Sequence, residues 1–327
     1  MPPPMPVDDN IWNLNRKMGV YKSTSYTNEH DKRDKILGGS QPGARIDFDS
    51  SVGQDEFARP DKNSSDRQHT EAYGSTEFFD ASKYTFPRER IPLEMQDESK
   101  TPLVIVACGS FSPITYLHLR MFEMARDYIL ENTNFEIMGG YFSPVSDFYQ
   151  KQGLAEAKHR VRMCELAVEK SSSWLMVDSW ESLQTSYQRT AIVLDHFQNE
   201  LNGADGEGGI RLKNGQFKSI KIMLLAGGDL VQSFAAPDVW ATADLHHIIG
   251  KYGCLILERT GSDVYEFLLS HDVLYKHRRN VFVIKQLIYN DISSTKIRLF
   301  IRRGMSIKYL LPTAVIDYIY KQGLYKD

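Results

Sequence analysis

The richest cluster of candidate functional residues lies in a strand–turn–helix unit of the sequence. Its apolar, β-branched run 103–108 is typical of a strand that is buried on both faces. Gly109 then permits a tight turn, which continues through Ser110 and Phe111. Apolar residues recur at helical spacing over 114–129 and predict a helix there. Because a helix start presents unpaired N–H groups and a positive dipole end, this unit predicts an anion-binding site.

A histidine and a proline near the start of this helix sharpen the prediction. His118 falls one turn inside the helix, near its positive end, and Pro113 is expected in the first turn, where its missing N–H costs nothing. The sequence contains neither G-x-x-x-x-G-K-[ST] nor G-x-G-x-x-G, which excludes a P-loop and the dinucleotide-binding fingerprint. A single histidine beside an apolar stripe is more often a packed core residue, so the functional interpretation of His118 depends on the whole motif.

A second polar cluster follows the apolar run 281–284, in the stretch N-D-I-S-S-T-K-I-R at 290–298. It combines hydroxyl residues that could cap a helix with cations in the expected first turns: Ser293, Ser294, Thr295, Lys296, Arg298, Arg302 and Arg303. The positive end of a helix normally attracts acidic residues, so these cations favour an anion held between them. Ser294 and Arg298 share one helical face. An ordinary cap on a basic surface helix is the alternative.

Between the two clusters, apolar runs alternate with amphipathic segments. Strands are expected at 135–137, 175–177, 221–226 and 254–258, and helices near 155–169, 187–201 and 263–270. This alternation predicts an α/β fold with a parallel sheet. A doubly wound sheet of this kind would bring the carboxyl ends of its strands, and therefore the two clusters, to one edge.

The two clusters resemble the signatures of a known superfamily. The stretch G-S-F-S-P-I-T-Y-L-H at 109–118 resembles the first nucleotidyltransferase signature, with Thr115 and His118 in its His/Thr-x-x-His element, and I-S-S-T-K-I-R at 292–298 resembles the second. Further segments make residues 102–325 similar to the fungal-type, eukaryotic nicotinamide/nicotinate mononucleotide adenylyltransferases: 143–154, 159–167, 177–184, 224–230, 239–245 and 252–261. The resemblance implies a Rossmann-like, doubly wound parallel sheet with helices on both faces. It also implies an enzyme of NAD biosynthesis that transfers AMP from ATP to nicotinamide or nicotinate mononucleotide, giving NAD or deamido-NAD plus pyrophosphate.

The resemblance also assigns the ATP side of the site. It implies catalytic roles for His118 and Arg298, and ATP binding by these two together with Gly109, Ser110, Phe111, Gly227, Asp229, Ser293, Ser294 and Thr295. The residues themselves support part of this, because Gly227 and Gly228 follow an apolar run and could present the Asp229 carboxylate to ribose hydroxyls. A glycine-rich turn in which Asp229 caps the next helix is the alternative. Since phosphate oxygens are ionised at neutral pH, the implied reaction needs substrate alignment and charge neutralisation but no general base.

For the mononucleotide side, the resemblance implies binding by Ser110, Lys151, Tyr187, Thr190, Trp240 and Arg259. A flat, electron-poor pyridinium favours aromatic faces, which suits Tyr187 and Trp240. Lys151 would meet the mononucleotide phosphate, and Arg259 is a further candidate along the phosphate path. Trp180 is expected in the core. Mg²⁺ is expected to arrive with ATP, because phosphate oxygens and water satisfy its coordination without a protein cage.

Composition divides the chain into two parts. Residues 1–100 are polar with few large aliphatic residues, so we interpret them as a disordered tail whose scattered aromatic residues, Phe86 among them, are solvated. Residues 101–327 are expected to form the nucleotidyltransferase domain. Within that domain the glycine-rich, polar stretch 202–219 is expected to be a surface insertion between a helix and a strand.

Charge and cysteine content restrict the class of protein further. The net charge of −3 is made of mixed signs and gives no footprint of a nucleic-acid partner. Cys108, Cys164 and Cys254 lie in apolar contexts without C-x-x-C spacing, which is typical of reduced core thiols in a soluble nuclear or cytoplasmic protein. No signal peptide or membrane-length apolar run is visible, so no membrane partner is expected. The family is commonly oligomeric, and a homo-oligomer is therefore expected.

Two alternative functions stay open at this point. A cytidylyl- or pantetheine-phosphate transferase would share the superfamily motifs, although the Trp240 region and the Lys151 loop argue against it, and substrate competition would decide. A non-catalytic nucleotide-binding or chaperone-like protein could also keep the fold. Intact Gly109, His118 and Arg298 argue against lost catalysis but are compatible with a second, binding role. Capture of partners by the tail alone would favour that role.

Overall fold

The central element of the fold is a six-stranded sheet. The computed structural model describes residues 81–234, 239–258 and 264–326. The strands of this sheet are β1 (Thr101–Gly109), β2 (Phe135–Pro144), β3 (Leu175–Val177), β6 (Lys221–Gly227), β7 (Cys254–Glu258) and β8 (Val281–Lys285). Each of them covers an apolar run that the sequence predicted to be a strand or to precede a motif.

Strand β2 is longer than expected, since it runs to Pro144 instead of ending near residue 137. Two adjacent glycines interrupt the apolar pattern there and hide the continuation of the strand. A Cβ atom added at Gly139 would lie 2.7 Å from the Ile91 side chain, and one added at Gly140 would lie 2.7 Å from the Leu175 side chain. These glycines are therefore required by close packing and do not mark a turn.

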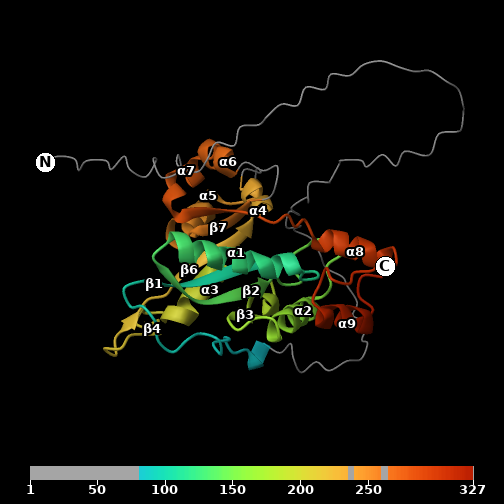
Figure 1. The fold of residues 1–327 in the computed structure, drawn as a ribbon, viewed down its shortest axis with the longest axis horizontal. Coiled ribbons are helices and arrows are strands. Elements are labelled where there is room, and N and C mark those ends of the chain that lie inside the picture. Colours follow the sequence, from blue (N-terminus) through green and yellow to red (C-terminus); the bar gives the residue numbers. More distant parts are fainter. Residues whose placement is uncertain (1–80, 235–238, 259–263, 327) are drawn as a thin grey trace, which may run out of the picture. The chain divides into compact units, whose positions relative to one another are not determined.

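The strands pair in the order β3-β2-β1-β6-β7-β8, and all five pairings are parallel (Figure 1). The chain builds the sheet outward from β1 in one direction and then, starting at β6, in the other. The predicted Rossmann-like, doubly wound architecture is thus confirmed. Its switch point, where this class of sheet binds ligands, lies between β1 and β6.

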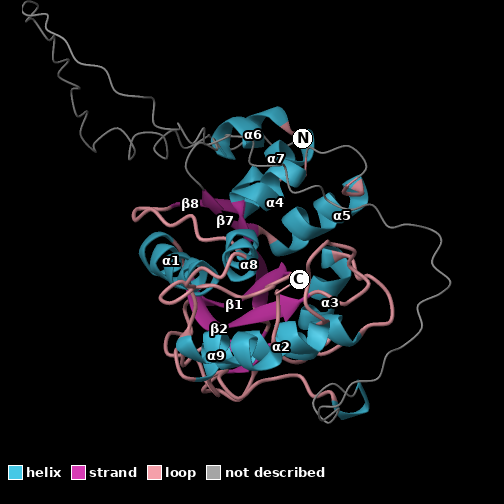
Figure 2. Ribbon diagram, turned by 90° about the vertical axis from the view of Figure 1, so that its right-hand side faces the viewer, coloured by secondary structure: helices cyan, strands magenta, loops and turns pink. Residues whose placement is uncertain are grey.

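Helices cover both faces of the sheet (Figure 2). Alternate residues of β1 enter opposite cores, with Leu103 and Ile105 in one and Val104 and Val106 in the other. The first core is completed by α1 (Tyr116–Asn132), α2 (Ala157–Glu169), α8 (Ser294–Arg302) and α9 (Thr313–Gln322). The second is completed by α3 (Thr190–Asn202), α4 (Gly228–Ser233), α5 (Thr242–His247), α6 (Val264–Ser270) and α7 (Asp272–Lys276).

The start of α1 differs from the prediction. The helix begins at Tyr116 with Thr115 as its N-cap, so Pro113 precedes the helix and does not occupy its first turn. His118 is the third helical residue, near the positive end as expected, and its Nδ1 accepts the backbone N–H of Thr115 at 2.9 Å. This histidine takes the place of the Glu or Gln that completes an ordinary capping box. Pattern reading missed the boundary because Pro113 suits a first turn equally well.

The stretch expected as an insertion, 202–219, connects α3 to β6 and contains a small antiparallel hairpin, β4 (Ile210–Arg211) and β5 (Phe217–Lys218). Its base is buried: the Asn202 side chain donates to the carbonyl of Ile220 at 2.9 Å and accepts its N–H at 2.6 Å. At the tip, Asn214 and Gly215 are exposed. The insertion is therefore anchored at its base and open to solvent at its tip.

Residues 84–95, which we call the N-terminal segment, differ from the expectation of an exposed polar tail. Phe86 and Met95 are only 7% and 3% exposed and pack into the second core. The hydroxyl of Tyr141 donates to the carbonyl of Pro87 at 2.7 Å. The guanidinium of Arg90 caps the end of α2 and the following turn by donating to the carbonyls of Val168, Ser172 and Leu175 at 3.1, 2.8 and 2.6 Å. Averaging composition over the first 100 residues hid this short packed stretch, and residues 1–80 lie outside the described part.

The three cysteines have the environments that the sequence predicted. All are free thiols, with Cys164 and Cys254 buried and Cys108 partly buried at the end of β1. Among the described residues, no helix is both long enough and apolar enough to span a membrane.

Candidate active site

The carboxyl ends of β1 and β6 form the centre of the candidate site. Gly109 ends β1 and Gly227 ends β6. A Cβ atom at Gly227 would meet no atom of the described residues within 4 Å, so the described part of the chain leaves open space beside this strand end. At Gly109 a Cβ would lie 3.0 Å from the Phe111 ring, so glycine allows this ring to close over the end of β1. The two glycines that the sequence assigned to ATP binding therefore lie at the switch point of the sheet.

The turn after β1 orients His118. Phe111 has a φ of 44°, a left-handed conformation that is uncommon for a residue with a side chain. Its buried ring packs edge-to-face on His118 and on Phe142, with ring centres 5.3 and 5.1 Å apart. Because Nδ1 of His118 accepts the Thr115 N–H, a neutral His118 carries its proton on Nε2. That nitrogen can donate a hydrogen bond to a phosphate oxygen.

The two sequence motifs are in direct contact in the folded chain. Ser294, the first residue of α8, donates from Oγ to the carbonyl of Pro113 at 2.8 Å. Arg298 is 6% exposed, and its guanidinium donates to the carbonyl of Ser112 at 2.8 Å and to Thr295 Oγ1 at 3.3 Å. Two helix starts and a buried cation therefore converge on one turn. Such an arrangement provides several donors for a polyphosphate.

The expected crowding of cations at the start of α8 is only partly present. Ser293 is the N-cap, and its Oγ accepts the backbone N–H of Lys296 at 3.2 Å. The Lys296 ammonium pairs with the Asp291 carboxylate at 2.7 Å on the exposed side of the helix. Arg302 is the last helical residue and Arg303 the C-cap, so their placement in the first turns was wrong. The helix spans only nine residues, and these two arginines complement the negative end of its dipole.

The residues predicted for the mononucleotide side come from two regions. Tyr187 is 44% exposed and stacks on Tyr149, with ring centres 5.8 Å apart, and Thr190 is the first residue of α3. Trp240 lies beyond the carboxyl end of β6, where its indole N–H donates to Ser233 Oγ at 3.0 Å. Its ring meets Phe234 edge-on at 5.0 Å between centres. The structure thus places aromatic faces in both regions, and the ion pair between Arg189 and Asp244, at 2.8 Å, connects the two regions.

The structure gives less detail for the other predicted site residues. Lys151 is half-buried in the turn that follows β2, and Ser110 continues the turn after β1. Asp229 belongs to α4, but its side chain is not among the described groups. Arg259 lies outside the described residues. Trp180, predicted to be a core residue, packs against the second core and stacks on His196 with ring centres 4.2 Å apart.

Arg160 is a site-shaping residue that the sequence reading missed. Its side chain is fully buried in α2 and donates to the carbonyls of Ala155 and Ser110 at 2.8 and 3.2 Å. It also pairs with the Asp147 carboxylate at 3.2 Å. The arginine therefore connects the turn after β1 to the loop that carries Lys151. A cation at an apolar-face position of an amphipathic helix was the available signal.

Glu181 is a second missed residue near the site. It follows β3, is 2% exposed, and accepts a hydrogen bond from the Ser143 hydroxyl at 2.7 Å. Burial, with a smaller contribution from the Asp178 charge, raises the pKa of Glu181 to about 8. A carboxyl group in this environment is protonated at neutral pH and can donate as well as accept a hydrogen bond. Its sequence context, within a polar stretch, gave no sign of burial.

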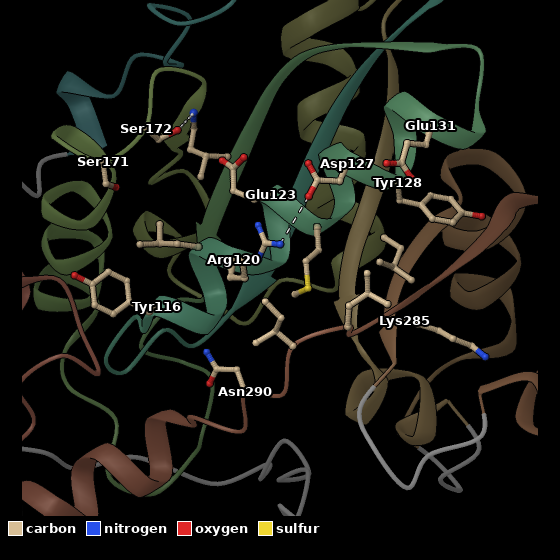
Figure 3. Close-up of a pocket in the computed structure, with 16 residues that line it drawn as sticks. Tyr116, Arg120, Glu123, Asp127, Tyr128, Glu131, Ser171, Ser172, Lys285 and Asn290 are labelled. Carbon is tan, nitrogen blue, oxygen red and sulfur yellow. Dashed lines mark hydrogen bonds and ion pairs between the residues drawn. The ribbon is translucent and has the colours of Figure 1, made fainter. Parts of the chain in front are cut away.

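A pocket on the opposite side of α1 is separate from this site (Figure 3). It is lined by Tyr116, Arg120 and Asp127 on the outer face of the helix and by Lys285 from the end of β8. An ion pair of 3.8 Å joins Arg120 to Asp127. His118 projects from the other face of α1 toward Phe111, so this pocket does not contain the candidate catalytic groups.

The comparisons with known proteins agree with this geometry. The cytidylyltransferase-like family matches residues 106–300. A nicotinamide/nicotinic acid mononucleotide adenylyltransferase 2 of Saccharomyces cerevisiae is 69% identical over 74% of this chain and 61% of its own length. The corresponding enzyme of Schizosaccharomyces pombe is 65% identical over 75% of this chain and 66% of its own length. The chain thus spans less than two-thirds of these yeast relatives.

A more distant relative is covered almost completely. Nicotinamide/nicotinic acid mononucleotide adenylyltransferase 1 of Bos taurus is 41% identical over 71% of this chain and 92% of its own length. Both sequence motifs fall within the segment matched by the family, as does the sheet except for the first residues of β1. The chain therefore belongs to the cytidylyltransferase-like family and, within it, to the nicotinamide/nicotinic acid mononucleotide adenylyltransferases.

Proposed function

We propose that the chain transfers the adenylyl group of ATP to nicotinamide or nicotinate mononucleotide. The products are NAD or deamido-NAD and pyrophosphate. The observation that carries the proposal is the contact between Arg298 and the carbonyl of Ser112, which joins the two phosphate-binding motifs into one site. The names of the three relatives, which refer to this activity, support the same reaction.

The proposed reaction is attack by the 5′-phosphate of the mononucleotide on the α-phosphorus of ATP. The new P–O bond forms as the bond to the β-phosphate oxygen breaks, and pyrophosphate leaves with that electron pair. Nε2 of His118 and the Arg298 guanidinium would neutralise charge on the phosphates, together with N–H groups at the starts of α1 and α8. The turn Gly109, Ser110 and Phe111 would hold ATP from the side of β1. Alignment of the two substrates then supplies the remaining acceleration.

The other proposed ATP contacts lie at the carboxyl end of β6 and at the start of α8. The open space beside Gly227 suits the adenosine ribose, with Asp229 as the acceptor for its hydroxyls. Ser293, Ser294 and Thr295 would meet the β- and γ-phosphates at the start of α8. ATP enters as its magnesium complex, and the ion is part of the substrate, held by phosphate oxygens and water.

The mononucleotide would lie between the two aromatic regions. Trp240 and Tyr187 would provide faces for the pyridinium ring, with Thr190 beside it at the start of α3. Lys151, Ser110 and Arg259 would bind its phosphate. Arg160 supports this arrangement, because it holds the turn of Ser110 against the loop that carries Lys151.

Two further parts of the proposal rest on the family resemblance and the composition. The family is commonly oligomeric, which supports a homo-oligomer, and sedimentation of the full chain tests it. Free cysteines in apolar surroundings support a nuclear or cytoplasmic location. Fluorescence microscopy of the tagged chain tests the location.

The decisive experiment measures pyrophosphate release from ATP and Mg²⁺ with each mononucleotide in turn. Release is expected with both mononucleotides, and His118→Ala should lower turnover about 10²–10³-fold, the scale for losing one transition-state donor. His247→Ala is the matched control, since this histidine pairs with Asp195 on the surface of α5 and should leave turnover unchanged. No release with either mononucleotide would refute the proposed function. Near-normal turnover in His118→Ala would refute the role of that residue.

A further inference from the structure

Tyr84 of the N-terminal segment is part of a polar cluster with two buried residues of the domain. Its hydroxyl donates to Asp178 Oδ1 at 2.9 Å and lies 3.0 Å from Nε2 of His196. The same nitrogen lies 3.1 Å from Asp178 Oδ2. Asp178 is fully buried, and His196 is 9% exposed. The tyrosine thus reaches from a segment that precedes the sheet into the interior of the second core.

The two partners of Tyr84 lie at the two ends of one functional stretch. Asp178 comes directly after β3, and its Oδ1 also accepts the backbone N–H of Trp180 at 3.3 Å. His196 belongs to α3, and Trp180 stacks flat on its ring with an interplanar angle of 8°. The stretch 181–190 between them carries Tyr187 and Thr190, the proposed mononucleotide contacts. One phenol therefore touches a residue on each side of the loop that would hold this substrate.

Burial makes the Tyr84 hydroxyl an important partner of Asp178. A buried carboxyl group needs hydrogen-bond partners, and Asp178 has three of them in the Tyr84 hydroxyl, the imidazole of His196 and the amide of Trp180. Burial and the Asp178 charge raise the pKa of Tyr84, so the phenol keeps its proton. Without this hydroxyl, Asp178 would lose one of its three hydrogen-bond partners, and the Asp178–His196 pair would be free to rotate toward other partners.

We propose that Tyr84 is a positioning residue for mononucleotide binding, acting through Asp178 and His196 to fix the loop 181–190. The inference rests on the proposed function, because it assigns this loop to the mononucleotide. It extends the site to a part of the chain that precedes the first motif by about 25 residues. ATP binding, which uses the turn after β1 and the start of α8, should not depend on Tyr84.

The N-terminal segment also offers a matched control. Tyr141 is fully buried in β2, and its hydroxyl donates to the carbonyl of Pro87 in the same segment at 2.7 Å. Tyr141→Phe therefore removes one buried tyrosine hydroxyl and one attachment of the segment, as Tyr84→Phe does. It leaves Asp178 and His196 with all their partners. Any effect of loosening the segment in general should appear equally in both variants.

The first test is steady-state kinetics of the full-length wild type, Tyr84→Phe and Tyr141→Phe. We expect Tyr84→Phe to raise KM for the mononucleotide about fivefold to tenfold, with kcat and the KM for ATP within about twofold of wild type. Tyr141→Phe should leave all three constants within about twofold. An unchanged mononucleotide KM in Tyr84→Phe, or equal changes in both variants, would overturn the inference.

The second test follows amide hydrogen exchange, which does not depend on activity. Exchange at residues 181–190 should become faster in Tyr84→Phe and stay as in wild type in Tyr141→Phe. Unchanged exchange there would overturn the positioning role. If the wild type released no pyrophosphate with either mononucleotide, the proposed function would fail. Faster exchange confined to Tyr84→Phe would then still support Tyr84 as the anchor of the loop, while the assignment of that loop to the mononucleotide would be overturned.

Discussion

Replacing Glu181 by glutamine should stabilise the folded protein relative to wild type, by an amount that grows as the pH rises. The side chain is 2% exposed, and its pKa is raised from an ordinary 4.5 to about 8, chiefly by burial. In the folded state the carboxyl group keeps its proton, whereas in the unfolded chain it ionises in water above pH 4.5. Glutamine has the same shape, stays neutral, and can still accept the hydrogen bond from the Ser143 hydroxyl.

The size of the effect follows from linkage between proton binding and folding. Between the unfolded pKa of 4.5 and the folded pKa of about 8, the folded state binds the proton more tightly, so wild-type stability falls as the pH rises through this window. Each pKa unit corresponds to about 1.4 kcal/mol. The advantage of Glu181→Gln should therefore grow to at most about 3 kcal/mol at pH 7 and at most about 5 kcal/mol above pH 8. Below pH 4.5 the pH-dependent part of the difference vanishes.

Urea unfolding of the full chain at intervals from pH 5 to pH 9 would measure this difference. Glu131→Gln is the control, because Glu131 is exposed on α1 and the same replacement there removes no buried carboxyl group. A constant difference between wild type and Glu181→Gln across the range would refute the reasoning. So would a difference that shrinks as the pH rises, since that would mean that Glu181 is ionised in the folded state.

Three other substitutions or treatments test separate parts of the structure. Arg298→Lys keeps the charge but loses the planar fork that donates to Ser112 and Thr295. Its kcat/KM should therefore fall about 10²-fold without loss of helical circular dichroism, and wild-type activity would contradict the proposed role. Phe86→Ala should lower the free energy of unfolding by about 3–5 kcal/mol in urea, whereas a solvated residue would change it by less than about 0.5 kcal/mol. Burial raises the pKa of Cys108, Cys164 and Cys254, so Ellman's reagent should titrate the three thiols only after denaturation. Rapid reaction of the native chain would contradict the burial of these thiols.

The sequence predicted the parts of the structure that local patterns encode. The apolar run that forms β1, the glycine that ends it and the presence of a helix after them all depend on neighbouring residues, and they were predicted correctly apart from the start of the helix. The contact between Arg298 and Ser112 was foreseen only as proximity, because a parallel sheet brings its strand ends together. Pattern could not supply the partner atoms.

What the sequence missed depends on contacts between distant segments. Arg160 and Glu181 are polar residues whose burial is decided by groups far along the chain, respectively Ser110 and Ser143. The N-terminal segment was overlooked because its two core side chains, Phe86 and Met95, are too few to create a periodic pattern. The ends of short helices such as α8 were also missed. In so short a helix, only one turn separates a cation near the positive end of the dipole from a cation near its negative end.

The contact between Arg298 and Ser112 also has a consequence for the order of folding. It closes a loop of 186 residues, and contacts of such long sequence separation carry a high entropic cost that is recovered only after the intervening elements have formed. The central strands can pair before α8 docks, but the carbonyl of Ser112 in the turn after β1 then lacks the Arg298 guanidinium. The recovery of activity during refolding should consequently lag behind the recovery of sheet structure. In this chain, the return of activity would therefore report when α8 docks against the turn after β1.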